Sequence, residues 1–346
     1  IGACDWSSDV CSSDLDARLG SPYFALGFLD AVAAVRRDTR VLRVRGEDGT
    51  VSFLPMQAGP FGHARALGGP LGDHHGLIGA PLDHDALSVA LRGAGVSVYD
   101  HHGALGMQPG FTGLADGSWV CDLSQGFEAL MRRRKKLGGN TARNIFAASR
   151  KLSEHGRLSF RFEDDRPEVL EQLFAWKSAQ YRNSRFFDVF SVDWTRSLLR
   201  RLLASGPSAD ARGVLSSLEV DGRLVAVHFG LMDAKVMHYW FPAYDADWAR
   251  QGPGNALLTH ILEALATRGV TELHLGPGDF RTKEAMGCWQ FPVVRGCVSG
   301  GGVVAAARAA AEAIERRAEA LPLGRVSQWP GKGFRRIDGS TAFRSV

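Results

Sequence analysis

The sequence predicts an α/β protein built on a mixed sheet, and three observations support this fold class. Three strand patterns follow one another between residues 213 and 245 with tight turns between them, as in an antiparallel meander. A loop rich in Gly and Pro then opens an apolar helix at residues 250–269, and further strand patterns come after that helix. This order differs from the repeated strand–helix–strand units of a doubly wound fold.

The N-terminal third is expected to contain both helices and strands. Residues 21–35 form a helical pattern that Ser21 caps, with a proline in the first turn. Residues 39–59 carry two strands joined by Asp48 and Gly49, a dipeptide typical of β-hairpins. The other elements expected there are a helix at about 83–94, a strand at about 96–99 and a short strand at 118–124.

The middle of the chain is mainly helical. A long helical pattern runs from about residue 125 to 155, and the adjacent Gly138 and Gly139 are expected to divide it into two. Pro167 stands in the first turn of the next helix pattern, at 166–183. The remaining expected elements are strands at 156–165, 271–277 and 291–299, a helix at 192–205, and an Ala-rich helix at 305–321.

Length and composition bound the class of protein. A chain of 346 residues with 45% hydrophobic residues suggests a globular protein of two domains. The net charge of +4 is mildly basic and does not by itself indicate a nucleic-acid partner. No apolar run reaches the roughly 18 residues that a membrane-spanning helix needs.

The cysteines indicate the expected redox setting. Their odd number and the lack of a C-x-x-C pair predict neither a zinc site nor a disulfide framework. A reducing, cytoplasmic location is therefore expected. The five are Cys4, Cys11, Cys121, Cys288 and Cys297.

The first 15 residues stand apart from the rest. They lack the basic and apolar regions of a signal peptide and resemble translated sequencing-adapter sequence. We therefore expect residues 1–15 not to be native and exclude them from fold reasoning. The native start, with any targeting signal on it, would then be missing.

The loop at 250–256 suggests a seat for an anion. The first N–H groups of a helix lack partners within the helix, and together with the helix dipole they favour a phosphate. Gly252 and Gly254 remove side chains that would block close approach, and Arg250 adds a positive charge. An ordinary Gly/Pro loop that merely starts a helix fits the same residues, so both interpretations stay open.

These elements resemble those of the GNAT superfamily of acyl-CoA acyltransferases. In that family a loop of the type R/Q-x-x-G-x-G/A holds the diphosphate of coenzyme A at a helix start. The resemblance implies acetyl-CoA or another acyl-CoA as co-substrate, with no metal. It also implies a tandem of a degenerate N-terminal GNAT-like domain, 16–124, and an intact one, 125–300, followed by a helix and tail, 301–346. The implied cofactor-binding residues are Arg250, Gln251, Gly252, Gly254, Asn255 and Ala256.

One branch is more similar, namely the acetyltransferases of bacterial cellulose and exopolysaccharide biosynthesis, which are related to Fem-type peptidyltransferases. That branch has Tyr-Asp at a strand end, Pro-Gly before the helix, and later a Gly-x-Gly-Asp turn with a Lys soon after. Thr282 departs from the pattern, since the branch commonly has Tyr there, and Pro253 interrupts the general loop motif. The matching residues are Tyr244, Asp245, Pro253, Gly254, Gly276, Gly278, Asp279 and Lys283.

The candidate catalytic residues are His238, Tyr239, Asp279 and Lys283. His238 has the residue type of a general base, as has His228 in the neighbouring strand, although either could simply pack in the sheet. Tyr239 or Tyr244 could protonate the departing thiolate, or either could pack at the sheet. Asp279 could act in the site or cap a helix, and Lys283 could bind a phosphate or acceptor carboxylate, or pair with Asp279 one turn away.

The expected function is transfer of an acetyl or other acyl group to an amine or hydroxyl of a small-molecule or saccharide acceptor, in polysaccharide or cell-envelope biosynthesis. A backbone N–H of the strand at 236–242 would polarise the thioester carbonyl. The alternatives are Fem-type transfer from an aminoacyl-tRNA and a catalytically inactive GNAT-derived scaffold of a polysaccharide system. The sequence indicates neither the acceptor nor the oligomeric state.

Three further motifs are given ordinary interpretations. The basic run 132–136 is expected to be a solvated helix face, and without interleaved aromatics it does not predict nucleic-acid binding. The histidine pairs at 74–75 and 101–102 do not predict a metal site. Residues 273–279 resemble the Gly-rich turn of S-adenosylmethionine methyltransferases, but they come late in the chain and no series of strand–helix units follows them.

Overall fold

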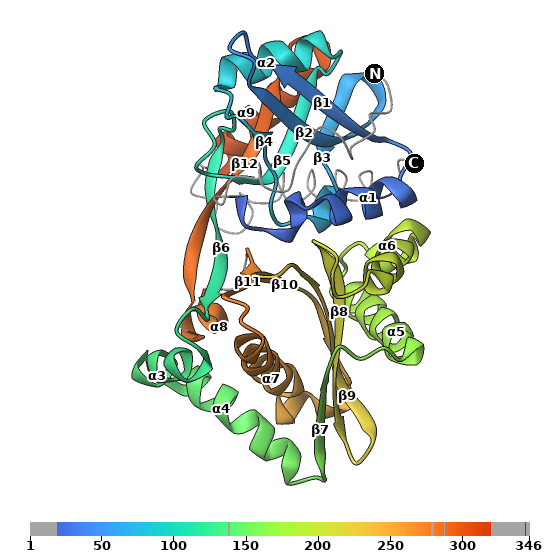
Figure 1. Cartoon of the computed structure of the whole chain (residues 1–346), viewed down its shortest axis with the longest axis vertical. Helices are drawn as coiled ribbons and strands as arrows, with labels where there is room; N and C mark the ends of the chain where they lie inside the picture. Colours follow the sequence, from blue (N-terminus) through green and yellow to red (C-terminus); the bar gives the residue numbers. More distant parts are fainter. Residues whose placement is uncertain (1–18, 138, 278–279, 287, 320–342, 344–346) are drawn as a thin grey trace. The chain divides into compact units, whose positions relative to one another are not determined.

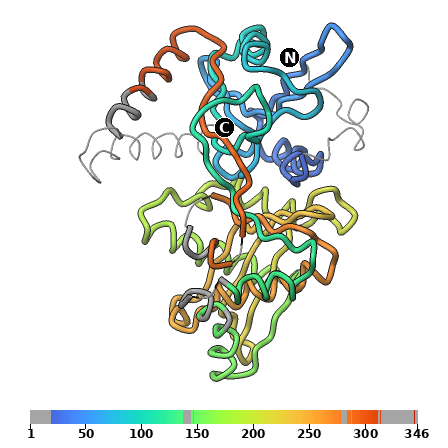
Figure 2. Tube along the Cα trace, turned by 90° about the vertical axis from the view of Figure 1, so that its left-hand side faces the viewer, coloured from blue at the N-terminus to red at the C-terminus, as the bar shows by residue number. Residues whose placement is uncertain are grey.

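The chain folds into two compact units. The computed structural model describes residues 19–137, 139–277, 280–286, 288–319 and 343 (Figure 1). The first unit comprises the described residues of Ile1–Phe24, Val32–Asp116 and Pro292–Val346, and the second those of Ala25–Ala31 and Gly117–Phe291. Figure 2 shows by colour that the first unit combines the early, blue to cyan part of the chain with the late, orange to red part.

Strands in the order β1-β2-β3-β5-β12 make the sheet of the first unit. β1 (Thr39–Arg45) and β2 (Val51–Ala58) form the expected hairpin. Its predicted turn is confirmed, since Gly49 has a φ of 86° and the Asp48 carboxylate accepts the N–H of Thr50 at 3.0 Å. The other strands are β3 (His63–Ala66), β5 (Val98–Leu105) and β12 (Trp289–Ser299), with β4 (Ile78–Gly79) paired to β2.

The helix expected at 83–94 is confirmed as α2 (His84–Gly93). Asp83 caps its start, because the carboxylate accepts the N–H of Ala86 at 2.8 Å. Leu87 and Leu91, one turn apart, are buried in the core of the first unit. The other helices before residue 117 and after residue 291 are η2 (Pro22–Phe24), α1 (Leu26–Val35), η3 (Pro60–Gly62), η4 (Gly69–Leu71) and α9 (Val303–Glu319).

Strands in the order β6-β11-β10-β9-β8-β7 make the sheet of the second unit. β8 (Arg212–Val220), β9 (Arg223–Met232) and β10 (Val236–Tyr244) form the predicted antiparallel meander. Asp221 and Gly222 turn between the first two with positive φ values of 49° and 79°, as a type I′ turn requires. β11 (Glu272–Gly276) runs parallel to β10, so the sheet is mixed, as predicted. The strands at the two ends of this order are β6 (Leu114–Asp122) and β7 (Leu158–Phe162).

Helices cover both faces of this sheet (Figure 1). α5 (Pro167–Asn183) and α6 (Asp193–Ala204) lie on one face, and α7 (Pro253–Thr267) lies on the other beside α4 (Gly139–Ser153). α3 (Phe127–Leu137) ends where α4 begins, which confirms the division expected at the two glycines. In the described part of the chain, no helix combines the length and apolar character needed to cross a membrane. The remaining helices are η5 (Val189–Ser191), η6 (Ala246–Gln251) and α8 (Phe280–Ala285).

The core of the second unit is organised around α7. Its buried residues Leu257, Ile261, Leu262 and Leu265 form one stripe, because spacings of three and four residues return to the same side of a helix. They pack in one cluster with β8, β9 and residues of α4. Each fully buried Leu or Ile stabilises the fold by about 1.5–3 kcal/mol. The first turn of α7 is therefore held in a fixed place against the sheet.

The structure corrects the expectation for the cysteines, because Cys121 and Cys288 form a disulfide. Cys121 lies in β6 and Cys288 directly precedes β12, and their Cα atoms are 4.4 Å apart despite a sequence separation of 167. Only the fold brings these strands together, so spacing along the sequence could not reveal the pair. Cys297 in β12 is half-buried, and Cys4 and Cys11 lie, with all of residues 1–15, outside the described residues.

Candidate functional site

β10 and β11 pair over only a short ladder and then part. The ladder joins Val236–His238 to Glu272–His274, whereas β10 continues to Tyr244 on β9 alone. A register shift between His238 and Phe241 interrupts the β9 ladder at the same point. In the described part of the sheet, β11 therefore pairs with no residue of β10 beyond His238, and β10 has an open edge after Tyr239. Such a free edge accepts an extended ligand by main-chain hydrogen bonds.

The chain after β10 turns through η6 into α7. Gly252 stands at the junction with φ 75° and ψ 46°, in the left-handed region that favours glycine. No side chain caps the start of α7, and Pro253 occupies its first turn. Proline has no backbone N–H, and this costs the helix nothing because an N–H at the first position would have no acceptor within the helix.

The first amides of α7 are mostly used within the turn itself. The N–H groups of Asn255 and Ala256 both donate to the Gly252 carbonyl, at 3.0 and 3.2 Å, and Gly252 N–H donates to Ala249 at 3.2 Å. Among the described residues, only the amide of Gly254 in this first turn has no acceptor. The helix start thus presents one unused donor together with the positive end of the helix dipole, rather than the row of donors that the sequence suggested.

Gly254 leaves that donor open to approach. A Cβ at this position would meet only Tyr244 Cδ1, at an ordinary 3.7 Å, and the backbone does not have positive φ. Neither packing nor conformation therefore requires a glycine here, unlike at Gly252. A residue with no internal reason to be small fits a place where a ligand approaches the backbone closely.

The six predicted cofactor residues divide by where they lie. Arg250 is exposed, and no partner for it is found among the described residues. Gln251 is turned toward His155, with Nε2 to Nε2 at 3.4 Å. Gly252 makes the cap, and Ala256 is fully buried in the core cluster. The residues that can contact a ligand directly are Arg250, Gly254 and the half-buried Asn255.

His238 is fully buried, and its ring lies 4.7 Å from the ring of His274. Burial first, and then His274, lowers the pKa of His238 well below its usual value. His274 in turn contacts Glu272, with Nε2 to Oε2 at 2.8 Å. A neutral ring without exposed surface favours the packing interpretation of His238 over direct contact with an acceptor.

Tyr239 and His228 stack face to face, with ring centroids 4.0 Å apart and planes 10° apart. Burial raises the pKa of Tyr239, so the phenol keeps its proton at neutral pH. Burial, with a smaller effect of Lys177, lowers the pKa of His228 to about 3. Neither ring nitrogen of His228 has a hydrogen-bond partner within the described structure.

The turn after β11 carries the other two predicted catalytic residues. Lys283 in α8 donates to the carbonyl oxygens of Gly276 at 2.8 Å and Pro277 at 2.7 Å, so it closes this turn. Asp279 and Gly278 lie outside the described residues. The ion pair proposed between Asp279 and Lys283 therefore stays a prediction.

Lys177 is a residue that the sequence reasoning missed. It belongs to the buried stripe of α5, where Nζ donates to the Pro242 carbonyl and to Gln180 Oε1, both at 3.0 Å. Burial lowers its pKa to about 8. A signal existed, because Leu170, Phe174 and Lys177 recur at helical spacing and place a lysine on an apolar face.

The basic run of α3 is not uniformly solvated. Arg134 is fully buried, with its guanidinium 3.2 Å from Met131 Sδ and 2.8 Å from Met286 Sδ. Arg133 bonds the Asp122 carbonyl at 2.7 Å. The expectation of a solvated face is therefore wrong for Arg134, since the helix turns this position inward. The members that remain exposed are Arg132, Arg133, Lys135 and Lys136.

The histidine pairs of the first unit are engaged in local contacts. His75 and His102 approach with Nε2 to Nε2 at 3.2 Å, and His102 Nε2 also lies 2.8 Å from the Gly72 carbonyl oxygen. A proton on Nε2 of His102 satisfies both contacts. Burial, more than the neighbouring histidines, lowers the pKa of His75 well below its usual value, so the ring of His75 is neutral.

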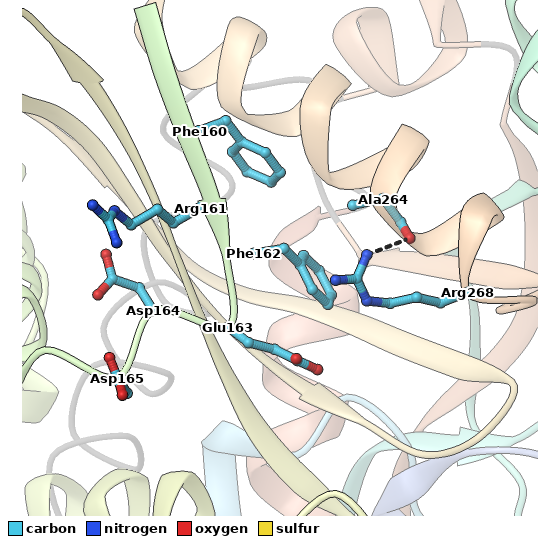
Figure 3. Close-up of a pocket in the computed structure, with 8 residues that line it drawn as sticks. All are labelled: Phe160, Arg161, Phe162, Glu163, Asp164, Asp165, Ala264 and Arg268. Carbon is cyan, nitrogen blue, oxygen red and sulfur yellow. Dashed lines mark hydrogen bonds between the residues drawn. The ribbon is translucent and has the colours of Figure 1, made fainter.

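A hollow of about 380 Å³ lies at the other end of α7 from Gly254. Figure 3 shows Phe160 and Phe162 on the α7 side of β7, whereas Arg161 and Asp164 point to the opposite side. The Arg268 guanidinium donates to the Ala264 carbonyl at 3.0 Å, and its Cζ lies 4.3 Å from the centroid of the Phe162 ring. Arg268 thereby binds a carbonyl oxygen of the last turn of α7. The hollow follows the outer edge of the sheet and is not part of the β10–α7 site. Its remaining lining residues are Glu163 and Asp165.

Comparison with known proteins identifies a domain family for part of the chain. Residues 139–284 match the acetyltransferase (GNAT) domain family. No curated protein sequence matches the chain.

The solved structures with a similar fold include two that each cover most of this chain. One is the C-terminal domain of a protein provisionally assigned as a lysylphosphatidylglycerol synthetase from Agrobacterium fabrum, with a TM-score of 0.53, 16% identity, and coverage of 82% of this chain and 91% of that one. The other is FemX, with a TM-score of 0.53, 10% identity, and coverage of 80% and 91%. At these identities the likeness concerns the fold. The second unit thus carries, across residues 139–284, a segment that matches the acetyltransferase (GNAT) domain, and its mixed sheet has the GNAT fold.

Proposed function

We propose that the second unit is an acyltransferase that takes an acetyl or other acyl group from acyl-CoA. One observation carries the proposal: β10 and β11 part after His238 and His274, and β10 leads through η6 into a helix whose Gly254 N–H is unused. The open edge of β10 and the start of α7, which is the proposed anion-binding site, are therefore connected by one short segment. The match of residues 139–284 to the acetyltransferase domain supports the same activity.

The start of α7 is the proposed seat for the diphosphate of coenzyme A. The Gly254 N–H donates to it, the helix dipole favours its charge, and Arg250 adds an exposed guanidinium. The open edge of β10 beyond Tyr239 receives the amide-containing arm as an added strand. The bound thioester supplies an already activated acyl carbon, so the protein mainly positions the acceptor and moves protons.

The register shift in β10 is the proposed place for stabilising the acyl oxygen. Backbone N–H groups between His238 and Phe241 are displaced there from the regular ladder with β9. One donor aimed at a developing oxyanion typically contributes about 3 kcal/mol to catalysis. Tyr239, at the same shift, holds its proton through burial and is the proposed donor to the departing sulfur.

The acceptor is proposed to be an amine or hydroxyl of a saccharide in polysaccharide or cell-envelope biosynthesis. The support is the similarity of Tyr244-Asp245 and Pro253-Gly254 to the branch active in cellulose and exopolysaccharide synthesis. A panel of amino sugars, sugar alcohols and simple amines, assayed for release of free thiol from acetyl-CoA, tests this. Cytoplasmic action is part of the same proposal, because acyl-CoA is a cytoplasmic metabolite.

Replacing Gly254 by Glu tests the cofactor site. The carboxylate would stand where the diphosphate belongs, and we expect the affinity for coenzyme A, measured by titration calorimetry, to fall at least about 100-fold, or roughly 3 kcal/mol. Gly206→Glu is the matched control, because Gly206 is an exposed loop residue of the same unit with nothing within 4 Å of its Cβ position. Equal affinity in both variants would remove the loop from the site, and no binding by the folded wild type would reject the proposal.

Transfer from an aminoacyl-tRNA is a second candidate, supported by the likeness to FemX and the exposed basic residues of α3. Neutralised phosphates release counterions, so tRNA affinity would fall steeply with salt. Replacing Arg132, Lys135 and Lys136 together by Gln would flatten that dependence. A scaffold without activity would instead bind coenzyme A and transfer nothing to any acceptor in the panel.

A further inference from the structure

Lys177 is a buried cation whose partners are all neutral. Its side chain is 9% exposed, and Nζ donates to the Pro242 carbonyl and to the Gln180 amide oxygen, both at 3.0 Å. No carboxylate pairs with it in the described part of the chain. A buried lysine without a countercharge holds its proton weakly, because burial disfavours the charged form. Its pKa of about 8 follows from that burial.

Pro242 places the Lys177 amine at the open edge of β10. Pro242 lies opposite His228 in the β9 ladder, where it has no N–H to offer. In an antiparallel pair, residues alternate between those that exchange hydrogen bonds and those whose backbone groups point away from the partner strand. A proline fits the second kind, so its carbonyl points away from β9, toward the side that β11 has left. The Lys177 amine, which donates to that carbonyl, therefore lies on the same side of β10.

The groups around Nζ leave its charge state free to change. The Tyr181 ring lies 5.4 Å from Nζ, and burial, with a smaller effect of Asp188, raises the pKa of Tyr181 to about 12. His228 faces it from β9 and is neutral, with a pKa of about 3. Asp188 at the start of η5 is engaged by the Ser178 hydroxyl at 3.0 Å and by Arg182 at 3.3 Å. Neither ring carries a charge at neutral pH, and the one carboxylate is already bonded.

Building on the proposed acyl-CoA function, we propose that Lys177 accepts the proton of the attacking amine or hydroxyl. The neutral Nζ takes this proton as the acceptor atom bonds to the acyl carbon and the C–S bond breaks. The resulting ammonium then gives a proton to the departing sulfur, directly or through Tyr239. Free thiol and acylated acceptor are released, and Lys177 is neutral again. The turnover therefore needs no other acid or base in net balance.

Competitive labelling of the full chain with a trace of acetic anhydride tests this placement without knowledge of the acceptor. Only neutral amines react, so the extent of labelling against pH, read by peptide mass spectrometry, titrates each lysine. We expect Lys177 to titrate near 8 and to be shielded several-fold by saturating coenzyme A. Lys235, exposed in the turn before β10, is the control and is expected to label equally with and without coenzyme A.

The outcomes separate this inference from the function on which it rests. If calorimetry shows coenzyme A binding but Lys177 labels equally in its presence, the role of Lys177 is wrong and the acyl-CoA site stands. If coenzyme A does not bind, both fail. If Lys177 titrates as an ordinary exposed lysine, its assignment as proton acceptor fails.

Lys177→Gln adds a kinetic test, since the amide still donates to the Pro242 carbonyl but cannot take a proton. With acetyl-CoA and an acceptor from the panel, we expect kcat to fall about 10²–10⁴-fold. The wild-type rise of kcat/KM through pH 8 should disappear, with coenzyme A affinity unchanged. Lys235→Gln should keep the wild-type profile. A retained pH limb in Lys177→Gln would overturn the role, because loss of a merely structural contact lowers the rate at every pH.

Discussion

His228 and Lys177 are two buried basic side chains of the second unit whose pKa values fall for the same reason and with different results. Removal from water disfavours the charged form of each. The shift takes His228 to about 3, so its ring is neutral at any physiological pH, and takes Lys177 only to about 8, where a small change decides its charge. The lysine is therefore suited to proton transfer and the histidine to packing on Tyr239.

The pH dependence of stability should report the buried state of His228. An unfolded chain binds a proton at this histidine below about pH 6.5, whereas the folded chain does so only near 3. As the pH is lowered from 6.5 towards 3, protonation of this one group in the unfolded chain should therefore lower the free energy of unfolding by up to about 1.4 kcal/mol per pH unit.

His228→Phe keeps the stacking on Tyr239 and removes the titration. Urea unfolding of the variant and wild type between pH 8 and pH 4 measures the contribution. We expect the two stabilities to be closest at pH 8 and to diverge in favour of the variant as the pH falls. Parallel curves would show that His228 is solvated in the folded protein.

The sequence gives residue types more readily than residue roles. The motif letters locate Arg250 and Gly254, because a ligand-facing helix start has a local signature. They also include Ala256, which packs in the core, and they pass over Lys177. Whether a lysine in an apolar stripe meets a carboxylate or a carbonyl depends on a strand 65 residues later, so the sequence pattern alone could not assign it.

Among the elements, α7 combines structural and proposed functional tasks. Its apolar stripe fixes the helix to the sheet, and its first turn presents Gly254. Because both belong to one rigid helix, loss of packing along the stripe should also disturb the anion seat. Stability and coenzyme A binding are thereby coupled through the element.

Leu262→Ala tests how much the apolar stripe of α7 contributes to stability. Leu262 is fully buried, so the truncation should lower the free energy of unfolding by about 2–5 kcal/mol through lost burial and a residual cavity. The neighbouring exposed Glu263→Ala should change it by less than about 0.5 kcal/mol. Denaturant unfolding measures both, and a loss in Leu262→Ala no larger than in the control would contradict the core described here.

Elements with local signatures were predictable, whereas their mutual geometry was not. Turns are marked locally by Asp48-Gly49 and Asp221-Gly222, and a helix start is marked by Pro167. The structure has a turn or a helix start at each of these places. The helix expected from Ser21 instead begins at Leu26, after a short turn in which buried Tyr23 donates to the Leu71 carbonyl at 3.2 Å. Similarly, the parting of β10 from β11 and the Cys121–Cys288 pair depend on strands distant in sequence.

For the whole molecule, the units do not follow contiguous stretches of chain. The sequence predicts boundaries near 124 and 300. In the structure, the first unit takes segments from both sides of residues 117–291, and the second also includes Ala25–Ala31. Gly27 joins this segment to the second unit by donating its N–H to Asp210 at 2.9 Å. The tandem-domain arrangement stays a prediction.

Phe28→Ala tests the membership of this segment. Phe28 is 1% exposed and meets the Trp240 ring edge-on, with centroids 6.3 Å apart. We expect a loss of about 3–5 kcal/mol in the unfolding of the second unit. Val89→Ala, at an exposed position of α2, is the control. Equal stabilities of the two variants would show that residues 25–31 are not part of the second unit.

The placement of β12 has a consequence for biosynthesis. β5 obtains its antiparallel neighbour β12 only from residues nearly two hundred positions later in the chain. A ribosome delivers the residues of the second unit's sheet before those of β12, and domains generally fold as units while they emerge. The segment that matches the acetyltransferase domain should thus fold during translation, while β5 lacks its antiparallel neighbour until β12 has been synthesised.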